Sequence, residues 1–177
     1  MFSVSSISPK HLLTVCFPDL EGGDLNTNAG SEMKARNTGH VINIGSVAGR
    51  EPYIGGSIYC ATKHAVRAFT GTLLRELVET QIRVTEIQPG MVETEFSIVR
   101  YRGDKGAADK VYQGFTPRMF AIIQVVLKAA KFHPVTANDV AEEIVWAASR
   151  PPHVNIAEVF VMPTNQATPW LVHRGDK

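Results

Sequence analysis

The chain has 177 residues, of which 44% are hydrophobic and 20% charged, and its 18 basic and 17 acidic residues leave a formal net charge of +1. These values fit one soluble globular domain, and the absence of a basic stripe argues against nucleic acid as a partner. The most apolar segment, Met119–Ala130, contains Lys128 and is shorter than the roughly 20 residues that span a bilayer, so we expect no membrane partner. Two cysteines, Cys16 and Cys60, form no Cys-x-x-Cys pair and predict reduced thiols in a cytoplasmic protein.

The first 37 residues differ from the rest of the chain. They are rich in Ser, Gly, Asn, Asp and Thr and show no sustained hydrophobic period, so residues 1–37 are expected to be irregular or poorly ordered, with a short helix at Ser31–Arg36. An ordered domain is expected over residues 38–177. It opens with the β-branched run Val41–Ile44, whose nearly continuous apolar character predicts a strand over 41–45 that is buried on both faces of a parallel sheet.

A long helix and a second strand follow. Val66, Phe69 and Leu73 recur at steps of three and four residues and predict a helix over Ser57–Glu79 with one apolar stripe. The run Ile82–Gln88 then predicts a strand that ends at Pro89-Gly90. A strand, a helix and a second strand in this order form a βαβ unit, whose strands are parallel.

The C-terminal part predicts further helices and a last strand. Thr136 can cap a helix over Thr136–Ser149, and Ala157–Met162 reads as a strand. The whole order therefore predicts an α/β fold with at least three parallel strands, 41–45, 82–88 and 157–162, between layers of helices. Between the second and third of these strands, the expected features are two short helices and an apolar segment, at Thr94–Arg102, Gly106–Phe115 and Met119–Phe132.

Tyr59 and Lys63 form the first pair that can carry chemistry. Residues four apart on a helix share a face, and a lysine ammonium beside a phenol lowers the pKa of the phenol from its ordinary ~10. Tyrosine then becomes a plausible general acid and base for an alcohol or carbonyl oxygen. Taken alone, this spacing more often marks an ordinary surface pair on a helix, so its meaning depends on context.

The context comes from two loops that follow strands. Ser46 lies thirteen residues before Tyr59, and the segment Pro89–Thr94 follows the next strand. In an open parallel sheet, ligands bind beyond the carboxyl ends of the strands, and both loops reach that edge. Gly90 would let the backbone approach a ligand closely, and Thr94 offers a hydroxyl near a helix start. A Gly-Ser turn and a Pro-Gly turn without any function are the alternatives.

Three segments of the chain resemble the short-chain dehydrogenase/reductase superfamily. They are Gly39–Gly49 (GHVINIGSVAG), Tyr59–Lys63 (YCATK) and Pro89–Thr94 (PGMVET), in the order and at the spacings of that family. The resemblance runs from about Met33 to about Pro169. Three shorter segments, Val92–Ser97, Arg100–Gly103 and the ending Pro163–Ala167, are similar to the NADP-dependent 3-hydroxy acid dehydrogenases, which oxidise serine, allo-threonine and similar small 3-hydroxy acids.

The resemblance implies a Rossmann-like doubly wound parallel sheet and a role for each matching residue. Tyr59 would exchange the proton with the substrate oxygen, Lys63 would assist it and hydrogen-bond the nicotinamide ribose, and Ser46 would orient the substrate oxygen. The remaining cofactor contacts would come from Pro89, Gly90, Val92 and Thr94. The cofactor would be NADP, with NAD not excluded, the substrate a small hydroxy acid or alcohol, and the protein a homodimer or homotetramer. No metal site is expected.

One further segment would match the substrate loop of the family, and two features of the chain depart from the family pattern. Phe96–Gln113 would form a substrate loop, in which Arg100 or Arg102 could meet a carboxylate. The family's first βαβ half, with its Thr-Gly-x-x-x-Gly-x-Gly phosphate loop, has no counterpart in the sequence, so we expect a chain truncated at its N-terminus. Residues 118–133 form an apparent insertion.

These departures leave three hypotheses. The leading one is an oxidoreductase that transfers hydride between NADP and a small 3-hydroxy acid or alcohol. The second is an inactive fragment or pseudoenzyme that retains only dimerisation and scaffold elements. The third is an epimerase or dehydratase that uses the same tyrosine and lysine. NADP binding would separate the first two.

Overall fold

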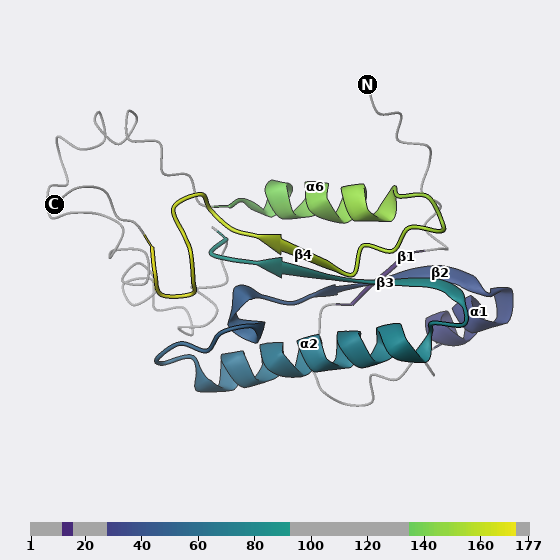
Figure 1. Cartoon of the computed structure of the whole chain (residues 1–177), viewed down its shortest axis with the longest axis horizontal. Helices are drawn as coiled ribbons and strands as arrows, with labels where there is room; N and C mark the ends of the chain where they lie inside the picture. The colour runs from purple at the N-terminus through teal and green to yellow at the C-terminus, as the bar shows by residue number, and fades with distance from the viewer. Residues whose placement is uncertain (1–11, 16–27, 93–134, 173–177) are drawn as a thin grey trace, which may run out of the picture.

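The computed structural model describes residues 12–15, 28–92 and 135–172. Four strands form one sheet in the order in which they occur along the chain (Figure 1). All three neighbouring pairs are parallel, with Val41 opposite Val84 and Ile87 opposite Val159. The parallel sheet predicted from the sequence is therefore confirmed, with four strands: β1 at Leu12–Val15, β2 at Thr38–Ile44, β3 at Gln81–Pro89 and β4 at Glu158–Val161.

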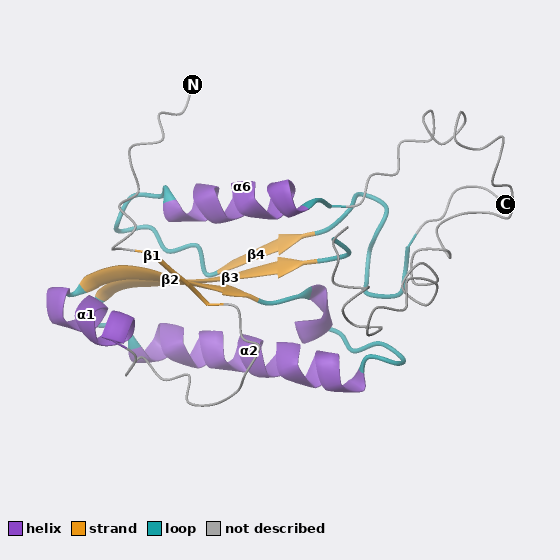
Figure 2. Ribbon diagram, turned by 180° about the vertical axis from the view of Figure 1, so that it is seen from behind, coloured by secondary structure: helices purple, strands orange, loops and turns teal. Residues whose placement is uncertain are grey.

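Helices cover both faces of this sheet. Helix α2, Ser57–Glu76, and the shorter α1, Asn28–Arg36, lie on one face, and α6, Ala137–Ala148, lies on the other. Figure 2 shows the same three layers from behind. A short 3₁₀ helix, η2 at Val47–Gly49, follows β2 and leads towards α2. The predicted three-layer α/β arrangement is confirmed in the described part of the chain.

The apolar stripe of α2 packs on the start of β2 and β3. Leu73 and Leu77 are buried with Val41, Val84 and other apolar side chains in one cluster. Alternating residues of a strand face opposite sides of a sheet, so the same strands also offer Ile42 to α6. The helix ends at Glu76, three residues earlier than predicted, where the Thr80 hydroxyl donates to the Leu77 carbonyl at 2.7 Å.

Helix α6 begins with the predicted cap. The Thr136 hydroxyl accepts a hydrogen bond from the Asp139 backbone N–H, and the Asp139 carboxylate accepts one from the Thr136 N–H, which completes a capping box. The Thr136 N–H and hydroxyl both donate to the Asp139 carboxylate, and these two hydrogen bonds lower the pKa of the Asp139 carboxyl. The helix covers a second apolar cluster, formed by Ile42, Ile87 and Ala148.

Residues 1–37 are more regular than their composition predicted. Residues 12–15 form β1, which pairs with β2 along His40–Asn43, and α1 begins at Asn28 rather than at Ser31. The helix expected at Ser31–Arg36 is therefore present and starts three residues earlier, whereas the irregular assignment is wrong for Leu12–Val15. The reason is tertiary: the open edge of β2 offers backbone donors and acceptors that a short strand can satisfy, whatever its own hydrophobic pattern.

Several predictions fall outside the described residues. They concern the two short helices at 94–102 and 106–115, the substrate loop 96–113 and the insertion 118–133. Within the described ranges, none of the helices combines the length and the apolar character that crossing a bilayer requires.

Candidate functional site

Ser46 is placed directly beyond the end of β2. It is buried and forms the N-cap of η2, where its Oγ accepts the Ala48 backbone N–H at 3.1 Å. Its hydroxyl points to the Pro89 carbonyl at 3.5 Å, which is at the outer limit of a hydrogen bond. A contact this long constrains the hydroxyl weakly, so the O–H can turn to a closer acceptor.

Lys63 is tied to the same end of β2. Its Nζ donates to the Ile44 carbonyl at 2.9 Å, two residues before Ser46. The same ammonium lies 5.8 Å from the centre of the Tyr59 ring, one turn earlier on α2. The side chains of Tyr59 and Lys63 are both partly exposed. Lys63 thus links the strand end that carries Ser46 to the helix turn that carries Tyr59.

The turn around Ser46 packs tightly on α2. A Cβ atom on Gly49 would lie 2.7 Å from the Lys63 backbone oxygen, well inside contact distance. Because neither backbone can move away without displacing a layer of the fold, a residue larger than glycine would separate η2 from α2. This close approach holds the serine turn against the helix that carries the other two candidate residues.

The segment after β3 lies at the same edge of the sheet as the end of β2. Pro89 is buried, Gly90, Met91 and Val92 are partly exposed, and Val92 makes a parallel bridge with Val135. The space beside Gly90 is filled, because a Cβ there would lie 2.6 Å from Gln166 Oε1. Gly90 is therefore required by its protein neighbours, a reason that the sequence did not indicate. Thr94 lies outside the described residues.

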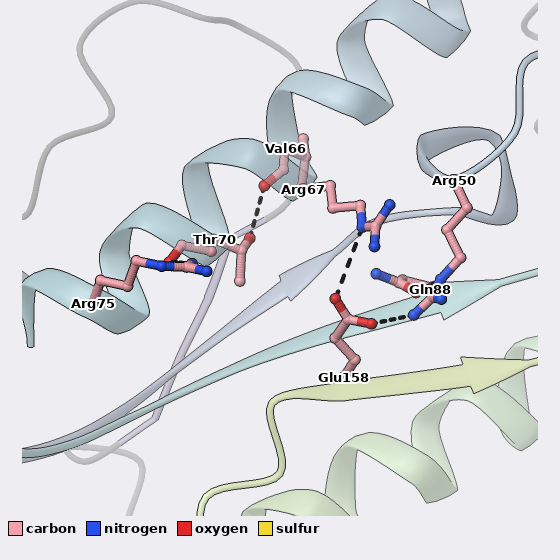
Figure 3. A network of polar contacts seen from close by, with 8 residues as sticks. Arg50, Val66, Arg67, Thr70, Arg75, Gln88 and Glu158 are labelled. Atoms are coloured by element: carbon pink, nitrogen blue, oxygen red, sulfur yellow. Dashed lines mark hydrogen bonds and ion pairs between the residues drawn. The ribbon is translucent and has the colours of Figure 1, made fainter. Parts of the chain in front are cut away.

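A charged network lies beside the serine turn (Figure 3). Arg50, the residue after η2, donates to the Gln88 side chain and pairs with Glu158 of β4. Glu158 also pairs with Arg67 of α2 at 3.8 Å. The network joins the end of η2 to β3, β4 and α2.

Glu86 is buried next to this network. Its side chain is 1% exposed, and burial is the largest cause that raises the pKa of its carboxyl. The neighbouring Glu158 raises it further, whereas the adjacent Gln88 side chain and the charges of Arg67 and Arg50 lower it. The buried carboxyl group favours its neutral form more than an exposed one would.

Three residues beside the predicted site carried no usable sequence signal. Gln88 and Gln166 are polar residues near Pro and Gly, and Arg50 follows a glycine in a loop, where solvent-facing side chains are the usual case. Their contacts join segments that are 38 to 108 residues apart in the sequence. Only the fold brings such pairs together. Within the described residues, the structure places no group of three or more His, Cys, Asp or Glu side chains where they could hold a metal ion.

Comparison with known protein families supports the resemblance that the sequence motifs indicate. Residues 25–104 match the profile of the short chain dehydrogenase family. This range includes Ser46, Tyr59, Lys63 and the loop after β3.

Curated relatives match a larger share of the chain. The NADP-dependent 3-hydroxy acid dehydrogenase of Schizosaccharomyces pombe is 42% identical over 140 residues, which are 79% of this chain and 48% of that protein. The protein of the same name from Escherichia coli is 44% identical over 144 residues, 80% of this chain and 51% of its own. The serine 3-dehydrogenase of Agrobacterium fabrum is 40% identical over 73% of this chain and 45% of its own. The chain thus spans about half the length of these relatives.

Solved structures agree with the sequence matches. The closed form of a serine dehydrogenase complexed with NADP+ has a TM-score of 0.66 and 41% identity, over 84% of this chain and 57% of that one. Serine dehydrogenase from Escherichia coli has a TM-score of 0.54 and 34% identity, over 77% of this chain and 45% of that one. With a parallel sheet, a serine turn, a Tyr-x-x-x-Lys helix and these matches, the chain has the Rossmann-like fold of the short-chain dehydrogenases and is similar to that family.

Proposed function

We propose that the described residues form the substrate and nicotinamide side of an active site that transfers hydride between NADP and a small 3-hydroxy acid. The observation that carries the proposal is the link through Lys63, whose Nζ contacts the carbonyl of Ile44 at 2.9 Å and lies 5.8 Å from the Tyr59 ring centre. This link ties the helix of the acid/base pair to the strand end that leads to Ser46. The names of the relatives support the cofactor and the substrate class.

Each of the three side chains has one task in the oxidation. Ser46 donates its loosely held O–H to the substrate hydroxyl oxygen and orients it. Tyr59, as phenolate, takes the proton from that hydroxyl as the C–H bond breaks and the carbonyl forms. The Lys63 ammonium stabilises the phenolate by its charge. In the reverse direction, Tyr59 returns the proton to the carbonyl oxygen.

The loop after β3 fits the remaining part of the cofactor site. When bound, NADP+ supplies the carbon that accepts the hydride. Pro89, Gly90 and Val92 would hold the nicotinamide from their place at the carboxyl end of β3, the edge at which ligands of such sheets bind. Thr94, outside the described residues, would complete this part of the site.

The test compares two tyrosines that are six residues apart. Serine-dependent NADPH production by the 177-residue chain is followed by nicotinamide fluorescence at millimolar NADP+. Tyr59→Phe removes the acid/base proton and should reduce turnover by about 10²–10⁴-fold. Tyr53→Phe makes the same chemical change in the loop before α2 and should leave turnover nearly unchanged. Equal losses in the two variants would contradict the assignment.

The affinity of the chain for NADP is expected to be low. No glycine-rich phosphate loop occurs in its 177 residues, and the charge-assisted hydrogen bonds of such a loop are worth about 1.5–3 kcal/mol each. A protein made of these 177 residues alone is therefore expected to be a poor enzyme. Micromolar affinity together with fast turnover would contradict this expectation, and the complete absence of serine-dependent NADPH would favour the scaffold hypothesis.

We also propose association into a homodimer or homotetramer through the outer face of α2. Ala61, Ala68 and Ile58, which is 78% exposed, lie on this helix away from the core. Small residues allow a second helix to approach closely. Sedimentation of a monodisperse monomer at micromolar concentration would contradict the proposal.

We propose a cytoplasmic location as well, which fractionation of cells would test.

A further inference from the structure

Gln166 is a buried polar residue in the segment that follows β4. Its side chain is 7% exposed and reaches back across the fold to the loop after β3. The side-chain Oε1 accepts a hydrogen bond from the Met91 backbone N–H at 2.8 Å, and the side-chain Nε2 donates to the Thr168 carbonyl at 3.0 Å. The two residues joined by the first bond are 75 positions apart in the sequence.

These two bonds fix the orientation of the amide group. A backbone N–H can only donate and a carbonyl oxygen can only accept, so the Gln166 oxygen must face Met91 and its nitrogen must face Thr168. A flipped amide would lose both hydrogen bonds at once in a buried position. The side chain therefore behaves as a defined two-point connector, with an acceptor at one place and a donor at the other.

The absence of a side chain at Gly90 leaves room for the Gln166 amide. A Cβ atom on Gly90 would lie 2.6 Å from Gln166 Oε1 and 3.1 Å from the Met162 sulfur. Gly90 itself is held by a different partner, since its backbone N–H donates to the Val161 carbonyl of β4 at 2.7 Å. Two successive amides of one loop thus have separate anchors, a strand backbone for Gly90 and a side chain for Met91.

We propose that Gln166 is a positioning residue for the cofactor, which fixes the Gly90-Met91 peptide in the shape that faces the nicotinamide. This inference rests on the proposed function for its last step, because the loop contacts the nicotinamide only if NADP binds there. Without the Gln166 oxygen, the Met91 N–H is left without this acceptor, and the peptide can turn towards other partners. The loop then reaches its binding shape in only a fraction of molecules, and affinity falls by that fraction.

The first experiment measures amide hydrogen exchange in the chain without any ligand. In Gln166→Met, which keeps the length but removes both polar atoms, the protection of the Met91 amide should fall about 10-fold. The Gly90 amide is the internal control, because its partner is the Val161 carbonyl. Trp170→Phe is the matched variant: it removes a 2.9 Å bond from the same segment to Glu51 and should leave Met91 unchanged.

A second variant gives a rescue that a purely structural role would not produce. In Gln166→Glu, a protonated carboxyl group accepts from Met91 and donates to Thr168, as the amide does, whereas a carboxylate faces the Thr168 carbonyl with no proton to donate. Burial raises the pKa of a carboxyl group placed there above its ordinary ~4.3. Met91 protection should therefore approach that of the wild type at pH 5 and fall at pH 8, where repulsion from the Thr168 carbonyl displaces the carboxylate. Gln166→Met should keep its reduced protection at both pH values.

The third measurement separates this inference from the proposed function. Reduced nicotinamide mononucleotide is titrated by fluorescence, because this half-cofactor needs no phosphate loop for an adenosine half. Binding should weaken about 10-fold in Gln166→Met and stay unchanged in Trp170→Phe. Unchanged Met91 protection in Gln166→Met, or an equal loss at Gly90 and Met91, would overturn the inference. Lost Met91 protection in a protein whose wild type does not bind the probe would overturn the proposed function instead.

Discussion

The two central strands bury polar side chains at both ends, on opposite faces of the sheet. Near their start, His40, Arg83 and Thr85 face α6. Near their end, Asn43 and two residues of β3, Glu86 and Gln88, face α2 and the network of Figure 3. All except Arg83 are at most 2% exposed, so neither group is a solvated surface.

The first group is almost fully hydrogen-bonded and supports the scaffold. Arg83 donates to the carbonyls of Ala147, Ala148 and Arg150, where α6 ends. The Thr85 hydroxyl donates its single proton to the Ile156 carbonyl at 2.6 Å, so His40 must donate its Nε2–H to Thr85 at 2.7 Å. Only His40 Nδ1 lacks a partner among the described residues of this group.

The second group retains more unpaired atoms and lies beside the candidate site. Asn43 Oδ1, Glu86 Oε1 and Gln88 Nε2 have no hydrogen-bond partner within the described part of the chain. The comparison teaches that buried polarity serves two purposes in one sheet. At the amino ends of the strands, buried polar side chains bind the carbonyls at the end of α6. At the carboxyl ends, they lie beside the candidate site and keep polar atoms without a hydrogen-bond partner among the described residues.

The largest effect in this comparison is expected from His40. Burial and the nearby Arg83 charge lower its pKa from 6.5 to about 4. The folded protein favours the neutral His40 ring, so this residue contributes its full share of the free energy of unfolding above pH 6.5. As the pH falls towards 4, the free energy of unfolding decreases by about 3 kcal/mol in all. Urea unfolding between pH 7 and pH 4 would measure this loss. His40→Gln, which can still donate to Thr85, should flatten the curve, and an unchanged slope would contradict the assignment.

Arg83→Met should have the next largest effect. It removes three hydrogen bonds at the end of α6 and should lower the free energy of unfolding by about 2 kcal/mol. It should also raise the pKa of His40, because the Arg83 charge is one of the causes that lower it. Arg75→Met is the control, since the Arg75 guanidinium donates only to the Gly71 carbonyl of its own helix among the bonds described. Equal losses in both variants would argue against the capping role.

Glu86→Gln should act in the opposite direction. The raised pKa means that the folded protein binds a proton more tightly than the unfolded chain, so wild-type stability falls as the pH rises from 4.5 through the folded pKa. The neutral amide should therefore stabilise the fold at pH 7 by about 1 kcal/mol, and the gain should disappear near pH 4.5. Glu142→Gln on the exposed side of α6 is the control. A destabilised Glu86→Gln protein at pH 7 would show that the carboxylate is needed in its charged form.

The smallest effect is expected from Glu158→Gln. This change removes the ion pairs with Arg50 and Arg67, whose side chains are 33% and 41% exposed. Partly exposed pairs contribute about 0.2–1 kcal/mol, and salt screens them. Unfolding in low salt should show the loss, and about 1 M NaCl should reduce it. A loss above about 2 kcal/mol would mean that this network belongs to the core.

The sequence predicted the parts of the molecule that have a local signal. Apolar spacing located α2, and Thr136 with Asp139 located the start of α6, because both features depend on residues within one or two turns. Ser46, Tyr59 and Lys63 could be named as a candidate site because their order and spacing form a pattern that can be recognised without coordinates. Their catalytic roles stay a prediction that the proposed assays would test.

The sequence by itself determined the parallel α/β arrangement, since buried strands that alternate with amphipathic helices have few other ways to pack. Only the tertiary structure decided that Leu12–Val15 closes the edge of β2 and that Gln166 reaches Met91. A strand of four residues is stabilised by the neighbour with which it pairs, and a single glutamine acquires a role only from the atoms around it. Both depend on contacts between distant segments, which leave no periodicity in the chain.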